Sequence, residues 1–511
     1  MLSASNQRVT KNTAVLSFRM LFTMGVTLYT SRIVLNVLGV ENYGIYNVVG
    51  GIVILLTFSN GAMLASSSRF LAFELGKNDY DQLKKTFSAA LTIHFIIAFI
   101  IFILAETVGL WFVLNKLVIP SSRLNASIWV YQFSILSCII SLIQVPYNAS
   151  IIAHERMNIY AYFSILDVSL KLAIVFLIKL IDSVDKLILY SFLILCTSII
   201  VIFAYKIYCK YQYEECSYHF HRDKTVYTKL INFSGWSLLG NFSWTMLTEG
   251  TNILLNLFFG PVVNAAQAIA SQVNSAVLGF VYNFRTAVNP QIIKLYAINE
   301  QEKMFVLYFQ SCKFSYFIIL LLTFPILLET NFVLHVWLKT VPDYTILLIK
   351  LTLVYSLVST FDSVSSVILQ AVGRLKETSL INISSTLFVI FPLTFILFKW
   401  GYKPYVLYYT MIFKAFIFSF IITPLLLYKI AHMKIKDYIT NVIIPTIKVT
   451  CTVCILPILL VYYFKDNVFR FLLICSVSSV SVIMSVLYVG MEKETRKEIF
   501  LIIKNKLRRH I

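Results

Sequence analysis

Polar side chains recur at helical spacing within three long apolar stretches of this chain. Residues three, four or eight apart lie on one face of a helix, so each set would form a polar stripe. The stripes are Arg19, Thr23, Thr27 and Thr30 in 13–37; Ser237, Asn241, Thr245, Thr248, Asn252 and Asn256 in 230–258; and Gln267, Ser271, Asn274, Tyr282, Arg285 and Asn289 in 264–289. Such stripes line an aqueous cavity or join packed helices through hydrogen bonds. Because each stripe has an ionisable group on it or beside it, we favour a cavity, which we expect where the two halves of the chain meet.

Basic residues on or near these stripes indicate the chemistry of a ligand. Arginine keeps its charge and binds phosphate oxygens bidentately, so we expect Arg19 and Arg285 to attract a phosphorylated ligand. Amides and hydroxyls exchange hydrogen bonds with sugar hydroxyls, so the predicted ligand combines phosphate with a glycan. The predicted cavity residues are Arg19, Arg32, Asn36, Arg69, Asn241, Asn252, Asn256, Gln267, Ser271, Asn274, Tyr282, Arg285 and Lys313. For Arg285 and Lys313 the alternative is that the side chains only extend to the membrane surface.

Acidic residues within apolar stretches are candidates for coupling to protons or sodium ions. Glu249 is the best of them, because oxygen-bearing side chains surround it in the sequence, and Asp362 and Asp167 follow. Asp167 and Lys171 are four residues apart and can pair on one helix face; we favour structural neutralisation over a proton relay for this pair. His94 stands alone on an apolar stretch and is expected to be an interior histidine.

The composition shows what must position these residues. Only 13% of the chain is charged and 59% is hydrophobic, whereas about a quarter of a typical soluble protein is charged. The runs 187–205, 378–398 and 471–491 carry no charge, and roughly twenty apolar residues are enough to span a bilayer. The sequence therefore predicts an all-α integral membrane protein.

Fourteen segments are long and apolar enough to be predicted as transmembrane helices. They are 13–37, 45–66, 87–109, 127–151, 160–180, 187–208, 230–258, 264–289, 309–330, 346–369, 378–398, 404–428, 440–463 and 468–490. With the N-terminus inside, 25 lysines and arginines fall in cytoplasmic loops and tails and 7 in outer loops. This bias predicts that both termini are cytoplasmic. It also explains the net charge of +19 without a nucleic-acid partner.

The order of segments predicts two halves. The longest connection, 209–229, separates a six-helix bundle in 1–212 from a second in 213–432, and 433–511 holds helices 13 and 14. A short match between residues 32–37 and 252–257 is typical of a parallel repeat. The tail 491–511 is expected to be a basic amphipathic helix on the inner leaflet, or an ordinary positive-inside anchor. Cys451 and Cys454 form a lone C-x-x-C in an apolar run, so no metal or cofactor is expected.

Several stretches are similar to a known family. The segment SRIVLNVLGVENYGIYNVVGGIVILLTFSNGAMLASSSRFLAFELGKND (31–79) resembles the opening of bacterial polysaccharide flippases of the Wzx type, and Leu38-Gly39-x-x-x-Tyr43-Gly44-Ile45-Tyr46 is its most specific part. Residues 263–292, 341–348 and 369–379 add to the resemblance, which covers about 8–430. These flippases belong to the multidrug/oligosaccharidyl-lipid/polysaccharide exporter (MOP) superfamily.

The resemblance implies two six-helix bundles around a central cavity in the bacterial cytoplasmic membrane. It implies a transporter rather than an enzyme, which moves an undecaprenyl-diphosphate-linked oligosaccharide from the inner to the outer leaflet. The product would serve lipopolysaccharide O-antigen or capsule assembly, with membrane lipid and other polysaccharide assembly proteins as candidate partners. The family's basic cavity is a feature that Arg19, Arg32, Arg69 and Arg285 could supply here.

Two other functions remain open at the level of sequence. A drug/cation antiporter of the same superfamily would favour an acidic, aromatic pocket, whereas the ionisable groups here lean basic. A membrane O-antigen polymerase or glycosyltransferase usually needs a large outer loop with paired carboxylates or arginines, and the outer loops here are short. No Walker motif points to ATP as an energy source.

The charge bias predicts opposite sides of the membrane for residues 217 and 340. In a cysteine-free variant, Thr340→Cys should react with an impermeant maleimide added to intact cells, and Ser217→Cys should react only after permeabilisation. The reverse labelling pattern would contradict the predicted orientation.

Overall fold

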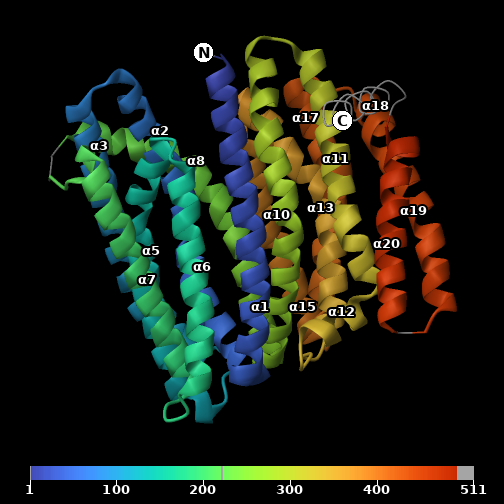
Figure 1. Ribbon diagram of the computed structural model, residues 1–511, viewed down its shortest axis with the longest axis horizontal. Helices are drawn as coiled ribbons and strands as arrows, with labels where there is room; N and C mark the ends of the chain where they lie inside the picture. Colours follow the sequence, from blue (N-terminus) through green and yellow to red (C-terminus); the bar gives the residue numbers. More distant parts are fainter. Residues whose placement is uncertain (1, 220–222, 466, 492–495, 497–511) are drawn as a thin grey trace, which may run out of the picture. The chain divides into compact units, whose positions relative to one another are not determined.

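The computed structural model describes residues 2–219, 223–465, 467–491 and 496, which form helices and connections without a β-strand (Figure 1). The α-helices are α1 Leu2–Leu56, α2 Ser59–Lys77, α3 Tyr80–Leu104, α4 Leu110–Asn115, α5 Leu124–Ala153, α6 Met157–Leu180, α7 Lys186–Gln212, α8 Lys224–Thr245, α9 Thr251–Phe259, α10 Pro261–Ala297, α11 Gln301–Leu328, α12 Thr330–Trp337, α13 Thr345–Val372, α14 Leu375–Ser385, α15 Phe391–Lys399, α16 Val406–Ile417, α17 Thr423–Ala431, α18 Ile435–Tyr438, α19 Ile444–Tyr463 and α20 Val468–Ser485. Short 3₁₀ turns lie at Ser121–Arg123 and Glu214–Cys216, and π-helical turns at Ala105–Gly109, Met246–Gly250, Thr386–Ile390, Phe418–Ile422, Ile439–Ile443 and Val486–Gly490. The predicted all-α class is confirmed.

Each of the fourteen predicted segments falls on helix. By length and apolar composition, eleven helical stretches of the described residues qualify as membrane spans, so the count of fourteen stays a prediction. One difference comes from α1, whose 55 residues contain a kink and cover the first predicted segment and part of the second. The predicted amphipathic tail lies outside the described residues, apart from Met491 and Arg496.

Two glycines of the Leu38–Tyr46 motif shape α1. Gly39 has φ 79°, ψ 164°, a conformation that side chains disfavour, and it breaks the helix direction there. At Gly44 a Cβ would lie 1.8 Å from the carbonyl oxygen of Pro261, so the absence of a side chain lets α1 approach the start of α10. The most specific part of the sequence motif therefore has a backbone explanation.

The helices form two compact units. Unit 1 comprises Met1–Ala268, Pro342–Tyr344 and Ser379–Pro404; unit 2 comprises Ile269–Val341, Thr345–Thr378 and Tyr405–Ile511. The predicted halves, 1–212 and 213–432, divide the chain by segment order and stay a prediction. By packing, α8 and α9 group with unit 1, because α8 contacts α2 and α3 and α9 contacts α1.

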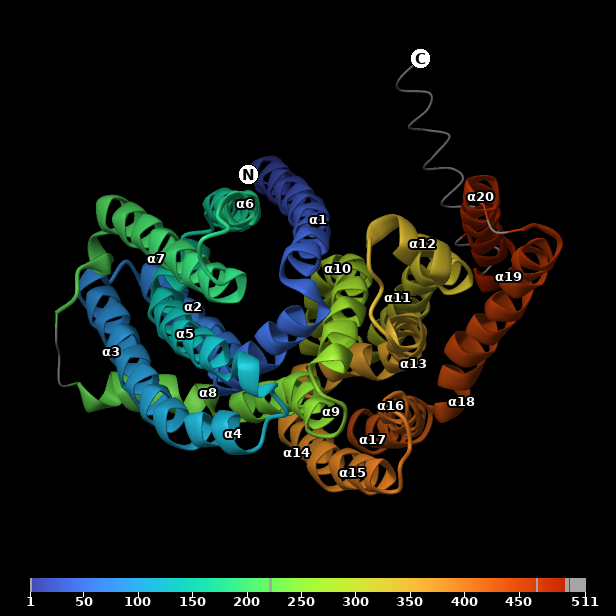
Figure 2. The same cartoon turned by 90° about the horizontal axis from the view of Figure 1, so that it is seen from below.

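Within unit 1, α5 is the central helix and packs on α1, α2, α3, α6 and α7. Viewed from below, α6 lies between α1 and α7, with α5 facing them from the other side (Figure 2). A buried apolar cluster that includes Leu71, Phe87, Tyr147 and Val201 holds α2, α3, α5 and α7 together. The four helices α1, α5, α6 and α7 also all pack on one another.

An ion pair fastens one end of these helices. Arg123, just before α5, binds Asp185 through Nη1 at 2.6 Å and Nη2 at 3.0 Å, and its Nε donates to Asn42 of α1. Asp185 also caps α7 by accepting from two backbone N–H groups. The hydrogen bonds from Arg123 lower the pKa of the Asp185 carboxyl below its usual range. The Arg123–Asp185 ion pair therefore stabilises the fold at any pH above the pKa that Asp185 has in the unfolded chain. Its contribution is lost as the pH falls through the lower pKa that Asp185 has in the folded protein.

Unit 2 is built around α13, which packs on α11, α16 and α17, while α19 and α20 pack on α11. A buried ion pair joins the end of α11 to α20. Arg470 Nε lies 2.8 Å from Glu329 Oε1, and the two side chains are only 12% and 1% exposed. Arg470 also donates to the Phe464 carbonyl, so one guanidinium connects α11, the α19–α20 loop and α20.

Breaking this pair should destabilise unit 2. Arg470→Met leaves a buried carboxylate without its partner, which typically costs about 3–5 kcal/mol. The double variant Glu329→Met/Arg470→Met removes both charges and should recover most of that loss. Thermal unfolding of the purified protein in detergent measures both; a double variant as unstable as the single one would contradict the explanation.

Candidate functional site

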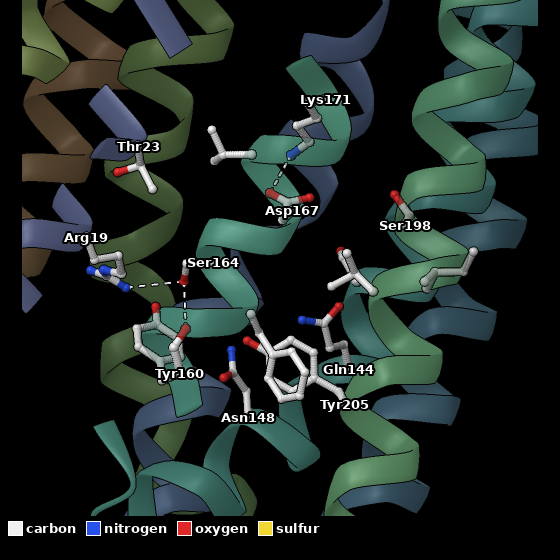
Figure 3. A pocket seen from close by; sticks show the side chains of 15 residues that line it. Arg19, Thr23, Gln144, Asn148, Tyr160, Ser164, Asp167, Lys171, Ser198 and Tyr205 are labelled. Carbon is white, nitrogen blue, oxygen red and sulfur yellow. Dashed lines mark hydrogen bonds and ion pairs between the residues drawn. The ribbon is translucent and has the colours of Figure 1, made fainter. Parts of the chain in front are cut away.

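A polar cavity of about 490 Å³ lies within unit 1, between α1, α5, α6 and α7 (Figure 3). The three charged side chains on its wall are Arg19, Asp167 and Lys171, all of which the sequence analysis singled out. The other polar groups on the wall are Thr23, Ser141, Gln144, Asn148, Tyr160, Ser164, Ser198 and Tyr205. Residues predicted separately for ligand binding and for ion coupling thus share one cavity.

Arg19 is held in the cavity by groups of α6. Its Nη1 donates to the Ser164 hydroxyl at 3.4 Å, and the guanidinium lies 4.8 Å from the centre of the Tyr160 ring. Ser164 in turn donates to the Tyr160 carbonyl, which orients its oxygen toward Arg19 (Figure 3). No carboxylate of the described residues forms an ion pair with Arg19, so its charge is available to an anion.

Asp167 and Lys171 pair on the wall formed by α6. Lys171 Nζ donates to Asp167 Oδ2 at 2.8 Å, and the side chains of Lys171 and Asp167 are partly exposed, at 42% and 31%. An exposed pair of this kind contributes little net stability, so opening it would cost little. With the pair closed, the three charged groups leave the cavity with one uncompensated positive charge.

The sequence analysis missed the contribution of α5. Ser141, Gln144 and Asn148 project from it into the cavity, at the same spacing of three and four that identified the other stripes. The signal was therefore present in the sequence, but α5 carries no charge within this stretch to draw attention to it. Tyr160 and Tyr205 were also missed, because an aromatic residue in an apolar segment does not stand out.

Asn252 and Asn256 belong to a buried network rather than to this cavity. Asn256 donates to Asn264 Oδ1 at 2.9 Å and accepts from the Val118 N–H at 2.9 Å. Asn264 donates to the carbonyl and side-chain oxygens of Asn252, both at 2.7 Å, and Asn252 donates to the Asn47 carbonyl. These hydrogen bonds close the turn between α9 and α10. Asn252 and Asn256 thus follow the alternative to a cavity, in which polar stripes join packed helices.

Glu249 lies in the π-helical turn Met246–Gly250 and faces α1. A Cβ at Gly51 would lie 2.7 Å from Glu249 Oε2, so this glycine leaves room for the carboxylate. The carboxylate also hydrogen-bonds to the Asn252 side chain. Glu249 therefore joins the end of the asparagine network and does not line the cavity around Arg19.

The other predicted residues of unit 1 lie outside the cavity around Arg19. Asn36 and Arg69 are exposed, Arg32 and Asn241 are half-buried, and Gln267 is buried. His94 is fully buried, with Nδ1 2.7 Å from the Ala90 carbonyl, as expected for an interior histidine.

In unit 2, some predicted residues cross-link helices and others do not. Asn274 accepts from Ser356 at 2.6 Å, and Arg285 donates to Ser315 at 3.4 Å and to the Thr360 carbonyl at 3.3 Å. Lys313 is buried in α11, whereas Ser271 and Tyr282 are exposed.

Asp362 has a basic neighbour that the sequence analysis missed. It accepts from Thr423 of α17 at 2.5 Å and interacts electrostatically with Lys414 of α16. The two ionisable residues are 52 positions apart in the sequence, so spacing along one helix could not have paired them.

The chain belongs to the family described as polysaccharide biosynthesis protein, whose family model matches residues 9–296. All residues on the wall of the unit 1 cavity fall within that range. No curated protein matches the chain in sequence.

Solved structures show which fold this is. An inward-facing MATE family multidrug resistance transporter of the MOP superfamily is similar with a TM-score of 0.64 at 14% identity, over 81% of this chain and 95% of that one. An outward-facing MATE transporter gives a TM-score of 0.61 at 14% identity, over 84% and 96%. The MATE multidrug transporter DinF-BH gives 0.61 at 15%, over 83% and 97%. The predicted family is confirmed by the family model, and the fold is similar to that of the MATE transporters. With eleven helical stretches of the described residues long and apolar enough to span a membrane, this is a multi-pass membrane protein.

The environment of Arg19 predicts a graded effect of its replacement. Arg19→Ala should lower the surface polysaccharide of producing cells about tenfold or more. The variant removes the hydrogen bond that we expect from the guanidinium to a phosphate of the ligand, and one such charge-assisted bond contributes about 1.5–3 kcal/mol. Arg19→Lys should retain part of the activity, since the charge remains but the bidentate geometry is lost. Lys210→Ala, exposed at the end of α7, is the matched control. Wild-type polysaccharide levels in Arg19→Ala cells would exclude Arg19 from the mechanism.

Proposed function

We propose that this protein flips undecaprenyl-diphosphate-linked oligosaccharide repeat units from the inner to the outer leaflet of the bacterial cytoplasmic membrane. The glycan would then enter O-antigen or capsule assembly. The observation that carries the proposal is the composition of the unit 1 cavity, where an arginine without a carboxylate partner among the described residues lies among amides, hydroxyls and aromatic rings. Membership of the polysaccharide biosynthesis family supports the same substrate class.

Each kind of group on the wall matches one part of such a ligand. Arg19 supplies a fork of N–H donors for phosphate oxygens. Gln144, Asn148 and Ser198 can donate to and accept from sugar hydroxyls, while the rings of Tyr160 and Tyr205 offer apolar surface to the C–H faces of a sugar. At about 490 Å³ the cavity has the size of a typical small-ligand site, so it would hold the head of the substrate and leave the lipid chain in the bilayer.

Transport against a gradient needs an energy source, and the half-buried carboxylates Glu249 and Asp362 are candidates. Glu249 beside Asn252 and Asp362 beside Thr423 and Lys414 are each placed to take up a proton or bind sodium. Alternating exposure of such a group to the two sides would convert an ion gradient into directed flipping. We propose proton or sodium coupling through Glu249 first, with Asp362 and Asp167 next.

A drug/cation antiporter is the second candidate, because the similar folds include multidrug transporters and because Asp167 faces the cavity. The charge balance argues against it. Asp167 is already paired with Lys171, and Arg19 would repel a cationic drug. The two functions thus differ in the sign of charge that the cavity accepts.

Deleting the gene tests the proposal directly. Cells without the protein should lose surface polysaccharide and accumulate lipid-linked repeat units on the inner leaflet, and a plasmid copy should restore both. Purified protein should bind lipid-linked repeat units and should not bind a cationic dye. Normal surface polysaccharide in the deletion strain, together with dye binding, would favour the antiporter instead.

A further inference from the structure

A second cavity in unit 1, of about 270 Å³, lies between the second half of α1, α5 and α7. Its polar wall includes Asn47, Thr57, Ser134, Ser137, Ser141 and Ser191. Ser141 also lines the larger cavity, so this residue of α5 borders both spaces.

One stripe of α5 runs past both cavities. Ser134, Ser137, Ser141, Gln144 and Asn148 follow one another at intervals of three, four, three and four residues, which places them on a single helix face. Fourteen residues of helix extend about 21 Å. This length exceeds one sugar ring and suits an extended chain of several.

Two groups on this stripe are left without protein partners. The Ser137 hydroxyl oxygen and the Asn148 side-chain oxygen are buried and have no hydrogen-bond partner within the described part of the chain. A buried polar group without a partner typically costs about 1–3 kcal/mol. Asn148 lines the larger cavity and Ser137 the smaller one. A rotation of either side chain would bring its oxygen to a water or a ligand hydroxyl in that cavity.

The two cavities differ in charge. The larger contains Arg19, Asp167 and Lys171, whereas the described wall of the smaller has no ionisable acid or base other than Tyr46 and Cys138 and adds the ring of Phe133. Hydroxyl and amide groups beside aromatic surface suit a neutral sugar. The charged part of a substrate would therefore stay beside Arg19.

We propose that the smaller cavity is a second saccharide subsite, which binds a neutral sugar of the glycan while the phosphate-proximal sugar occupies the cavity around Arg19. The glycan then lies along α5, exchanging hydrogen bonds with Ser134 and Ser137. This inference rests on the proposed function and adds to it a preference for the length of the glycan.

Binding of two lipid-linked probes to the purified full-length protein tests the subsite. The probes are the complete repeat unit extracted from producing cells and the intermediate that carries only the first sugar. Ser137→Leu fills the smaller cavity and should weaken binding of the complete unit about tenfold, with no change for the first-sugar intermediate. Arg19→Ala should weaken both. Leu136→Phe adds bulk on an exposed face of the same helix and should change neither.

A second variant guards against misfolding of Ser137→Leu. Ser134→Ala/Ser137→Ala leaves the cavity open and removes both hydroxyls, so it should weaken only the complete unit, about threefold to tenfold. Equal effects on both probes, or no effect of either serine variant, would overturn the subsite. Equal affinity of the wild type for both probes would also overturn the second subsite while leaving the proposed function intact. Binding of neither probe would contradict both the subsite and the proposed function.

Discussion

A bilayer core offers no hydrogen bonds, and this constraint governs the use of every polar group in the chain. Many serine and threonine hydroxyls of the described residues meet it within their own helix by donating to a carbonyl three or four residues earlier, as Thr251, Thr352 and Thr446 do. Such residues can sit anywhere along a span. An asparagine amide can also donate to the carbonyl four residues earlier, as Asn42 and Asn47 do. It has a second N–H and an oxygen, however, and these need partners on another helix or in water.

The two outcomes for amides are both seen in unit 1. Asn252, Asn256 and Asn264 satisfy one another and nearby backbone groups, and they thereby fix the turn between α9 and α10. Gln144 and Asn148 instead face the cavity beside Arg19. A group of the first kind stabilises the fold, and a group of the second kind is free to exchange its hydrogen bonds with a ligand. Amides of the second kind, together with Arg19, are the groups of the candidate site that a ligand could engage.

The roles of the charged side chains also depend on their burial and on their partners, and an unpaired buried charge costs more than an unpaired amide. Glu329 and Arg470 are buried together and join α11 to α20, whereas Asp167 and Lys171 pair on a cavity wall and are partly exposed. Arg19 has a tyrosine ring and a hydroxyl for neighbours and no carboxylate among the described residues. The buried pair thus supports the structure, the pair on the cavity wall contributes little to stability, and Arg19 keeps an accessible positive charge. The burial of each side chain and the partner beside it decide which of these roles it has.

Hydropathy and periodicity in the sequence were enough to predict the helices and the membrane class, because these depend on local composition. The family was predicted from the resemblance of motifs such as Leu38–Tyr46. The Asp167–Lys171 pair was predictable for the same reason, since its members are one helical turn apart. The contact of Arg19 with Ser164 spans 145 residues, and no pattern along one helix contains it. Stripes of equal spacing in 241–256 and in 134–148 became a packing network and a cavity wall respectively. Only the tertiary structure decided between them, because a polar face acquires its role from the helix that lies opposite.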